Sequence, residues 1–210
     1  MSVTVHALML AALGTPGAPP EAPVDTTYGR IDGDIGLVLG AGVTVAGRGP
    51  RATVDMRLRY LDTVGAFATY EDGPLVSSHT DPRRVIATGL ELRPLFLARW
   101  LRGAETGIAR LDLAIDSIGI DIGAFFAQPE GAPLGARPGF QIGLGMELPI
   151  LPRASGPWIG IHGAARWSDA ALGGDILRGP SDRALVLSIT LAWHQLVGAH
   201  VVDLNDTAPK

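Results

Sequence analysis

The stretch RATVDMRLRY, residues 51–60, decides the fold class of this chain. Its even positions from Val54 to Tyr60 are apolar, and its odd positions from Asp55 to Arg59 are charged. Successive side chains of a β-strand point to opposite faces, so this stretch predicts a strand with one apolar and one ionic face. Which of these faces is hidden from water determines the class of protein.

The same period of two recurs along most of the chain, which predicts an all-β fold. We expect seven strands, over residues 35–46, 52–70, 86–93, 110–126, 139–150, 158–167 and 185–194. In the fourth of these the apolar positions change from odd to even near Asp116 and Ser117. One inserted residue has this effect, so we expect a β-bulge there.

The connections between the predicted strands differ in length. Those at 47–50, 94–107 and 151–157 are short or intermediate, and they alternate with long polar loops at 72–83, 128–137 and 169–183. Such asymmetry is typical of outer-membrane barrels, which have short turns at one end and long loops at the other. The segment LFLARWLRGAETG, residues 95–107, is less regular. It is compatible with a short interfacial helix or turn that places Trp100 near lipid headgroups, or with a capping segment.

The composition is unusually apolar for a soluble protein: 47% of its 210 residues are hydrophobic and only 18% are charged, with a mean hydropathy of +0.25. No apolar run reaches the length of roughly 20 residues that a membrane-spanning helix needs. A net charge of −4 gives no basic footprint, so we expect no nucleic-acid partner. The chain has no cysteine, which excludes disulfides and thiolate metal sites.

The N-terminal region 1–27 is signal-like or flexible. Its apolar segment SVTVHALMLAA is followed by a Pro/Gly/Ala stretch, as in a secretory signal peptide, but no Lys or Arg precedes Arg30. An additional strand and a disordered lead are the other interpretations. We expect one barrel domain over residues 28–195 and a C-terminal tail over 196–210.

Alternation alone does not separate a membrane barrel from a soluble barrel or sandwich. Three features favour the membrane barrel. The apolar faces are long and aliphatic, and Arg57 or Arg59 turned toward lipid would cost roughly 2–4 kcal/mol each. The opposite faces are rich in glycine, which suits a narrow lumen. Aromatic residues lie near predicted strand ends, where membrane barrels carry aromatic girdles: Tyr60, Tyr70, Trp100, Trp167 and Trp193.

In this pattern the chain resembles the small bacterial outer-membrane β-barrel proteins of the eight-stranded OmpA/OmpX-like type. The resemblance implies an antiparallel up-and-down transmembrane barrel of about eight strands in a bacterial outer membrane. Since seven strands are evident and a closed barrel of this type has an even number, the eighth would come from residues 2–12 or from the segment ending near Leu204.

The charged and polar residues on the other strand faces are then candidate lumen residues. We expect ionic pairs that fill the lumen, giving a structural role or at most a narrow, porin-like pore, because eight strands leave little room beyond side chains. The long loops would be available for a surface ligand. The candidate lumen residues are Asp34, Asp55, Arg57, Arg59, Glu91, Arg93, Asp112, Asp116, Asp121, Glu147, His162, Arg166 and His194.

Two alternatives remain open. One is a soluble periplasmic β-barrel or sandwich that binds an apolar ligand. The other is a barrel lipid hydrolase, for which Ser78 beside His79 is the candidate pair; Ser188 and His194 share a face but lie about 20 Å apart on one strand. No catalytic, cofactor or metal motif is evident, since the five histidines lack ligand spacing. We therefore expect no enzyme and no cofactor.

Overall fold

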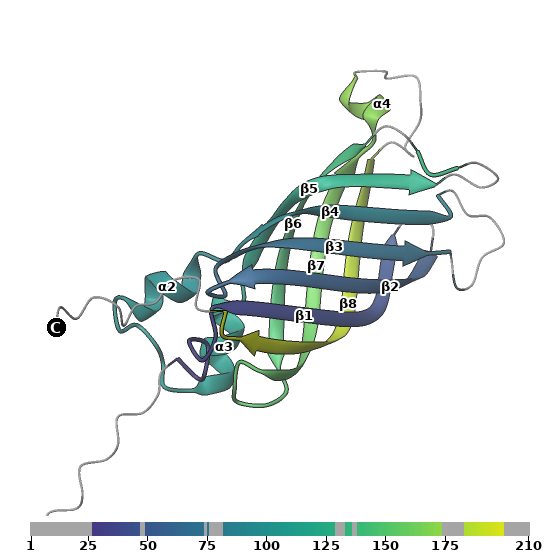
Figure 1. Cartoon of the computed structure of the whole chain (residues 1–210). Coiled ribbons are helices and arrows are strands. Elements are labelled where there is room, and N and C mark those ends of the chain that lie inside the picture. Colours follow the sequence, from purple (N-terminus) through teal and green to yellow (C-terminus); the bar gives the residue numbers. More distant parts are fainter. Residues whose placement is uncertain are drawn as a thin grey trace, which may run out of the picture.

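The computed structural model describes residues 27–46, 49–73, 75, 82–128, 133–135, 138–173 and 183–199. Eight antiparallel strands form a closed barrel in which each strand pairs with its neighbours in sequence, and the last pairs with the first (Figure 1). The strands are β1 (Ile35–Ala46), β2 (Gly49–Tyr60), β3 (Val64–Asp72), β4 (Arg84–Leu92), β5 (Gly119–Gln128), β6 (Gly139–Pro149), β7 (Gly156–Trp167) and β8 (Arg183–Val197). The predicted eight-stranded up-and-down architecture is therefore confirmed.

The eighth strand does not come from either terminus. The predicted strand over 52–70 is two strands, β2 and β3, joined by a tight turn at residues 61–63. Leu61 and Asp62 take positive φ angles of 48° and 51°, and the amide of Thr63 donates to the carbonyl of Tyr60 at 3.0 Å. Tyr60 then pairs with Val64, so apolar side chains stay at even positions on both sides of the turn. Because the apolar positions are even both before and after the turn, the alternation alone does not reveal that the chain reverses its direction there.

The predicted bulge near Asp116 and Ser117 is wrong. Residues Ala109–Asp116 form the helix α3, and β5 begins only at Gly119. The apolar positions change from odd to even because a helix ends there and a strand starts. A second helix, α2 (Leu95–Trp100), precedes α3 in the connection between β4 and β5, and a short helix, α4 (Asp169–Leu172), follows β7.

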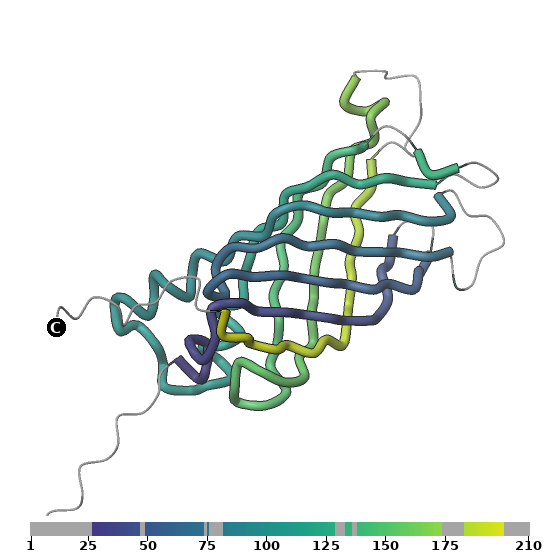
Figure 2. Tube along the Cα trace, viewed as in Figure 1, coloured from purple at the N-terminus to yellow at the C-terminus, as the bar shows by residue number. Residues whose placement is uncertain are grey.

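The two ends of the barrel differ. The turn at 61–63, the α2–α3 connection and the turn between β6 and β7 lie at the end from which β1 starts and at which β8 finishes, called here the helical end (Figure 2). The other connections lie at the opposite, loop end. The predicted turn at 47–50 belongs to this loop end, beside the long loops, and not to the end with the other short connections.

Several predicted segments lie wholly or largely outside the described residues. These are the signal-like segment 1–27, the tail 196–210 beyond residue 199, and most of the loops 72–83, 128–137 and 169–183. No helix in the described ranges has the length and apolar character needed to cross a membrane.

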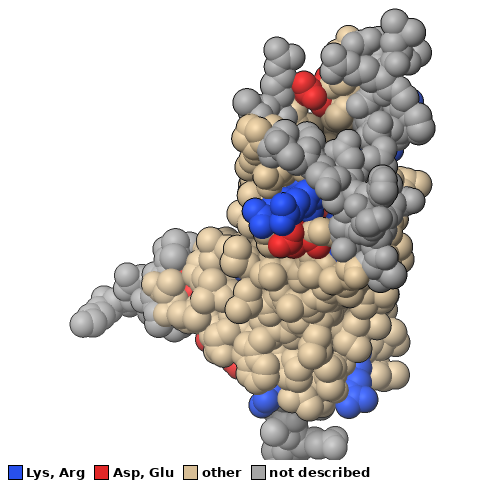
Figure 3. Space-filling model, turned by 90° about the vertical axis from the view of Figure 1, so that its right-hand side faces the viewer, with Lys and Arg blue, Asp and Glu red and all other residues tan. Residues whose placement is uncertain are grey.

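The apolar face of every strand points out of the barrel. Leu39, Leu144 and Leu185 are 61%, 60% and 79% exposed, respectively. Within the eight described strands, the ionic side chains at outward positions are Asp72, Arg84 and Arg183, all at the loop end. In Figure 3, accordingly, most of the described surface is tan, and charged atoms are scarce over the barrel wall in view. The interior, in contrast, is ionic.

Candidate functional site

The interior of the barrel is the candidate site because it holds nearly all the ionic side chains of the strands. Glycines at other inward positions make room for them. A Cβ added at Gly145 would lie 2.2 Å from the ring of His162, and one added at Gly119 would lie 2.9 Å from the side chain of Arg93. The glycine-rich inward faces thus allow large charged side chains to cross the lumen.

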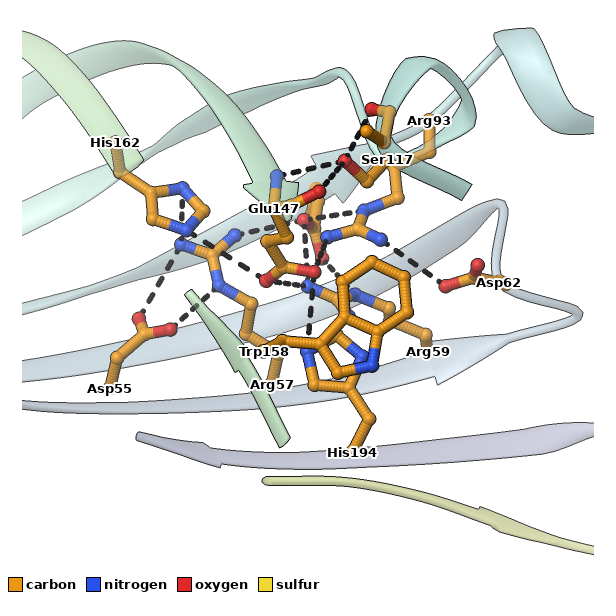
Figure 4. Close-up of polar contacts among 12 residues, drawn as sticks. Asp55, Arg57, Arg59, Asp62, Arg93, Ser117, Glu147, Trp158, His162 and His194 are labelled. Atoms are coloured by element: carbon orange, nitrogen blue, oxygen red, sulfur yellow. Dashed lines mark hydrogen bonds and ion pairs between the residues drawn. The ribbon is translucent and has the colours of Figure 1, made fainter. Parts of the chain in front are cut away.

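Arg57 on β2 points into this interior, toward Asp55 and His162 (Figure 4). Its guanidinium donates to Asp55 at 2.9 Å, to Glu91 at 2.9 Å and to Asp121 at 3.1 Å. These carboxylates come from β2, β4 and β5, so a single side chain links three strands. Burying a charge is costly unless it is paired, and Arg57 is paired on several sides.

A second group of ion pairs lies nearer the helical end, around Glu147 on β6. Arg59 donates to Glu147 at 2.8 Å and to Glu91 at 2.8 Å, and Arg93 also binds both carboxylates. Arg93 further reaches Asp62, in the turn between β2 and β3, at 3.3 Å. Arg59, Glu91, Arg93 and Glu147 all have side chains at most 2% exposed, so water does not screen their charges. We call the seven residues Asp55, Arg57, Arg59, Glu91, Arg93, Asp121 and Glu147 the ionic plug.

Two histidines flank the ionic plug. The ring of His194 stacks on Trp158 with centroids 4.5 Å apart and planes 6° from parallel, and its Nε2 lies 3.3 Å from a carboxylate oxygen of Glu147. The Nδ1 of His162 lies 3.1 Å from a guanidinium nitrogen of Arg57. Since a guanidinium only donates, this Nδ1 accepts, and the hydrogen of neutral His162 sits on Nε2.

A smaller polar layer lies toward the loop end. Arg166 on β7 donates to Glu71 at 2.7 Å and to Gln141 at 2.9 Å. Between this layer and the ionic plug lies a cavity of about 30 Å³, which has room for about two water molecules. Thr53 and Thr190 are among the residues that line it. Among the described residues, the ionic plug and the Arg166–Glu71–Gln141 layer thus lie on either side of this cavity.

The helical end is closed by a second ionic cluster. Asp116 in α3 accepts from Arg30 and Arg99 at 2.6 Å each, and Arg99 also donates to Asp112 at 2.6 Å. The phenol of Tyr28 donates to Asp112 at 2.9 Å. Ser117, just after α3, accepts from the backbone amide of Glu147 at 2.8 Å and so links the α3 segment to β6. The cap consists of α2, α3 and their connections, residues 93–118, with residues 27–34 packed against them.

These contacts shift two acid–base equilibria in the cap. Burial alone would raise the pKa of Asp112, but hydrogen bonds from the Thr106 amide, Arg99 and Tyr28 outweigh it and lower the pKa to about 2. Burial and the hydrogen bond to the Asp112 carboxylate raise the pKa of Tyr28 to about 12. The cap therefore holds an ionised carboxylate and a neutral phenol over a wide pH range.

The structure brings most of the predicted lumen residues together. The seven residues of the ionic plug, with His162, Arg166 and His194, point into the barrel. Asp112 and Asp116 are buried too, but they belong to α3 in the cap and not to a strand, which corrects their predicted placement. Asp34 precedes β1 at the helical end, is half-buried, and accepts from the backbone amide of Ala199 at 2.5 Å.

Sequence reasoning missed several interior residues. Arg51 and Glu71 carried a usable signal, because they stand directly before and after the predicted strand 52–70, at odd positions in phase with Arg57. Arg30, Tyr28 and Arg99 lie outside the strands, where no period of two marks an inward position. Ser78 and His79, the candidate hydrolase pair, lie outside the described residues.

No protein-family model matches the chain, and no curated protein matches it in sequence. Over the described ranges, no group of three or more His, Asp or Glu side chains is arranged to hold a metal ion. The function is therefore inferred from the geometry of the barrel itself.

Proposed function

We propose that this chain is a bacterial outer-membrane β-barrel protein with a closed, charge-filled lumen and a structural, non-conducting role. The observation that carries the proposal is the inside-out arrangement of the barrel: aliphatic side chains cover its outer wall, and guanidinium and carboxylate groups fill its interior. A soluble monomer rarely exposes an apolar patch of more than a few hundred Å². Here the apolar side chains surround the whole barrel.

The dimensions of the wall suit a bilayer. Strands β1 and β2 have 12 residues each, or about 40 Å at the usual rise per residue. A tilt of about 40° reduces this to roughly 30 Å along the barrel axis, close to the thickness of the hydrocarbon core. The outward ionic residues Asp72, Arg84 and Arg183 fall at the strand ends, where headgroups would be.

Aromatic side chains support the same placement. Tyr60 and Trp193 stand at outward positions near the helical end, while Tyr70, Phe140 and Trp167 do so near the loop end. Phe140 and Trp167 contact each other with ring centroids 5.9 Å apart. Two aromatic belts separated by aliphatic residues are the usual arrangement of barrels that cross the outer membrane.

The interior favours a closed barrel over a pore. The ionic plug crosses the lumen from several strands, and the Arg30–Asp116–Arg99 cluster lies beneath it. The cavity between the plug and the Arg166–Glu71 layer has room for about two water molecules. A soluble barrel that binds an apolar ligand would need an apolar interior, whereas ion pairs of the plug and of the Arg166–Glu71 layer cross the interior here.

Cysteine labelling in bilayers tests the proposal, since the chain has no native cysteine. Leu144→Cys and Leu191→Cys should react with a lipid-soluble maleimide and resist a membrane-impermeant one. Thr190→Cys, which is buried in the lumen, serves as the inward control and should resist both. Folding in detergent should give heat-modifiable gel migration, and planar bilayers should show no steady conductance. A chain that stays folded and monomeric in buffer without amphiphile would contradict the proposal.

A further inference from the structure

The cap repeats the inside-out arrangement of the barrel. Its ionic residues Asp112, Asp116 and Arg99 face inward and pair with one another, and its large apolar residues include several that face outward. A helix cap over the end of a soluble barrel would have the opposite arrangement, with charges in water and apolar groups inside. We therefore expect the outer side of the cap to contact something other than bulk water.

In α2, the inner side is formed by Phe96, which is buried beneath the guanidinium of Arg30 at 4.5 Å. Trp100 stacks on Phe96 with ring centroids 6.4 Å apart and is still 38% exposed. Leu101, directly after the helix, is 76% exposed. The helix begins three residues after Leu92, the exposed apolar residue that ends β4.

In α3, the inner side is formed by Asp112, Leu113 and Asp116, all buried. Ile108 and Leu111, one turn apart, are 60% and 44% exposed and give the helix an outward apolar stripe. The connection then rejoins the wall at the exposed Ile120 of β5. Both helix segments therefore carry exposed apolar side chains at the helical end of the barrel.

Within residues 93–118, the exposed charged side chains are basic. Arg102 and Arg110 are exposed, and no ion pair or hydrogen bond of their side chains is found among the described residues. Arg99 is already neutralised by Asp112 and Asp116, and Glu105 is half-buried. Exposed arginines beside Trp, Leu and Ile side chains are the composition of segments that lie in a membrane interface and attract anionic lipid.

We propose that the cap is a lipid-binding surface that lies in the headgroup region of the leaflet at the helical end. Trp100, Leu101, Ile108 and Leu111 enter the boundary between headgroups and acyl chains, and Arg102 and Arg110 bind the phosphates of anionic phospholipids. This inference depends on the proposed membrane location and adds to it the lipid class recognised and the residues that recognise it.

Spin labels test the depth of the cap. Leu101→Cys, and Ile108→Cys as a second site, are labelled with a nitroxide, refolded into vesicles of phosphatidylcholine with or without phosphatidylglycerol, and probed with oxygen and a water-soluble nickel complex. Leu172→Cys, on the equally exposed helix α4 at the loop end, is the aqueous control, and Leu144→Cys is the bilayer control. Heat-modifiable migration verifies that each variant has folded.

We expect the oxygen-to-nickel accessibility ratio at both cap sites to be several-fold above that at site 172 and below that at site 144. Cap ratios equal to that at site 172, with a high ratio at site 144, would overturn the cap proposal and leave the membrane barrel intact. A low ratio at site 144 as well would overturn both.

The charge of the lipid tests the arginines. With phosphatidylglycerol present, the labels on the cap should lie deeper than in pure phosphatidylcholine, and the double variant Arg102→Gln/Arg110→Gln should lose this difference. A depth that does not depend on anionic lipid in the parent labelled protein, or a dependence that persists in the double variant, would overturn the headgroup assignment.

Discussion

Replacing Glu147 by Gln removes the carboxylate on which the ionic plug converges, while the size of the side chain stays the same. Glu147 accepts from Arg59 and Arg93 and lies 3.3 Å from His194. The amide of Gln retains one acceptor oxygen and turns an NH₂ group toward guanidinium donors. The variant therefore leaves at least one buried cationic donor unpaired.

The expected loss of unfolding free energy is about 3–5 kcal/mol, which is typical when one partner of a buried ion pair is removed. The lost charged hydrogen bond contributes about 1.5–3 kcal/mol of this, and the unscreened repulsion between Arg59 and Arg93 contributes the rest. Because Glu91 still pairs with both arginines, we expect a value near the lower limit, about 3 kcal/mol.

Urea unfolding of the barrel refolded in detergent micelles, followed by tryptophan fluorescence and gel migration, measures the loss. For a slope of about 2–3 kcal/mol/M, the midpoint should fall by about 1–1.5 M. Asp72→Asn is the matched control, since it breaks the exposed Arg84–Asp72 pair of 3.4 Å and should cost at most about 1 kcal/mol. A Glu147→Gln variant as stable as this control would refute the view that the plug stabilises the barrel. Additive effects of Glu147→Gln and Arg93→Met would refute the direct coupling of these two residues.

Three further outcomes are expected. Gly145→Ala should destabilise the barrel by about 1–3 kcal/mol because its Cβ would lie 2.2 Å from the His162 ring, whereas Gly163→Ala, with no atom closer than 3.9 Å, should have little effect on the urea midpoint. Because the pKa of Asp112 is about 2, below the value near 4 of an ordinary Asp, its carboxylate stabilises the cap fully above pH 4. This contribution should be lost as the pH falls through 2. Limited proteolysis of residues 93–118 across this pH range tests the expectation, and the Asp112→Asn variant should show no such pH dependence. Because its pKa is raised to about 12, Tyr28 should remain neutral at a pH near 10, where an ordinary tyrosine ionises. Its contribution to stability should be lost only as the pH rises from 10 through 12. Absorbance at 295 nm should therefore show a tyrosinate step at high pH, and Asp112→Asn should move that step to lower pH.

The strand pattern of this chain was predictable because a barrel wall imposes a strict period of two on its side chains. Arg57, Glu91 and Glu147 could be assigned to one kind of face from their alternation with aliphatic residues alone. Their partners could not be assigned, because strand register and barrel closure decide which inward residues meet across the lumen. Glu147 and Arg59, for example, come from strands that are not neighbours in the sheet.

Two errors arose where different structures produce the same sequence pattern. The turn at Leu61 and Asp62 contains no Gly or Asn, and the alternation continues through it with unchanged parity. In the α3 segment, Leu111, Leu113 and Ile115 alternate as in a strand, while Ile108, Leu111 and Ile115 also follow helical spacing. A helix of eight residues is too short for the sequence to separate these two periods.

The seam between β1 and β8 determines when the barrel becomes complete. Ile35 pairs with Val197, so the earliest strand has no second neighbour until nearly the entire barrel sequence is available. Until then the sheet has two open edges, each a template for pairing with another chain. At Gly42 the seam is so close that an added Cβ would lie 1.9 Å from the carbonyl oxygen of Ile189. Assembly of this protein therefore depends on protecting the open edges of an incomplete sheet from pairing with other chains. The exposure of these edges matters most just before β8 pairs with β1.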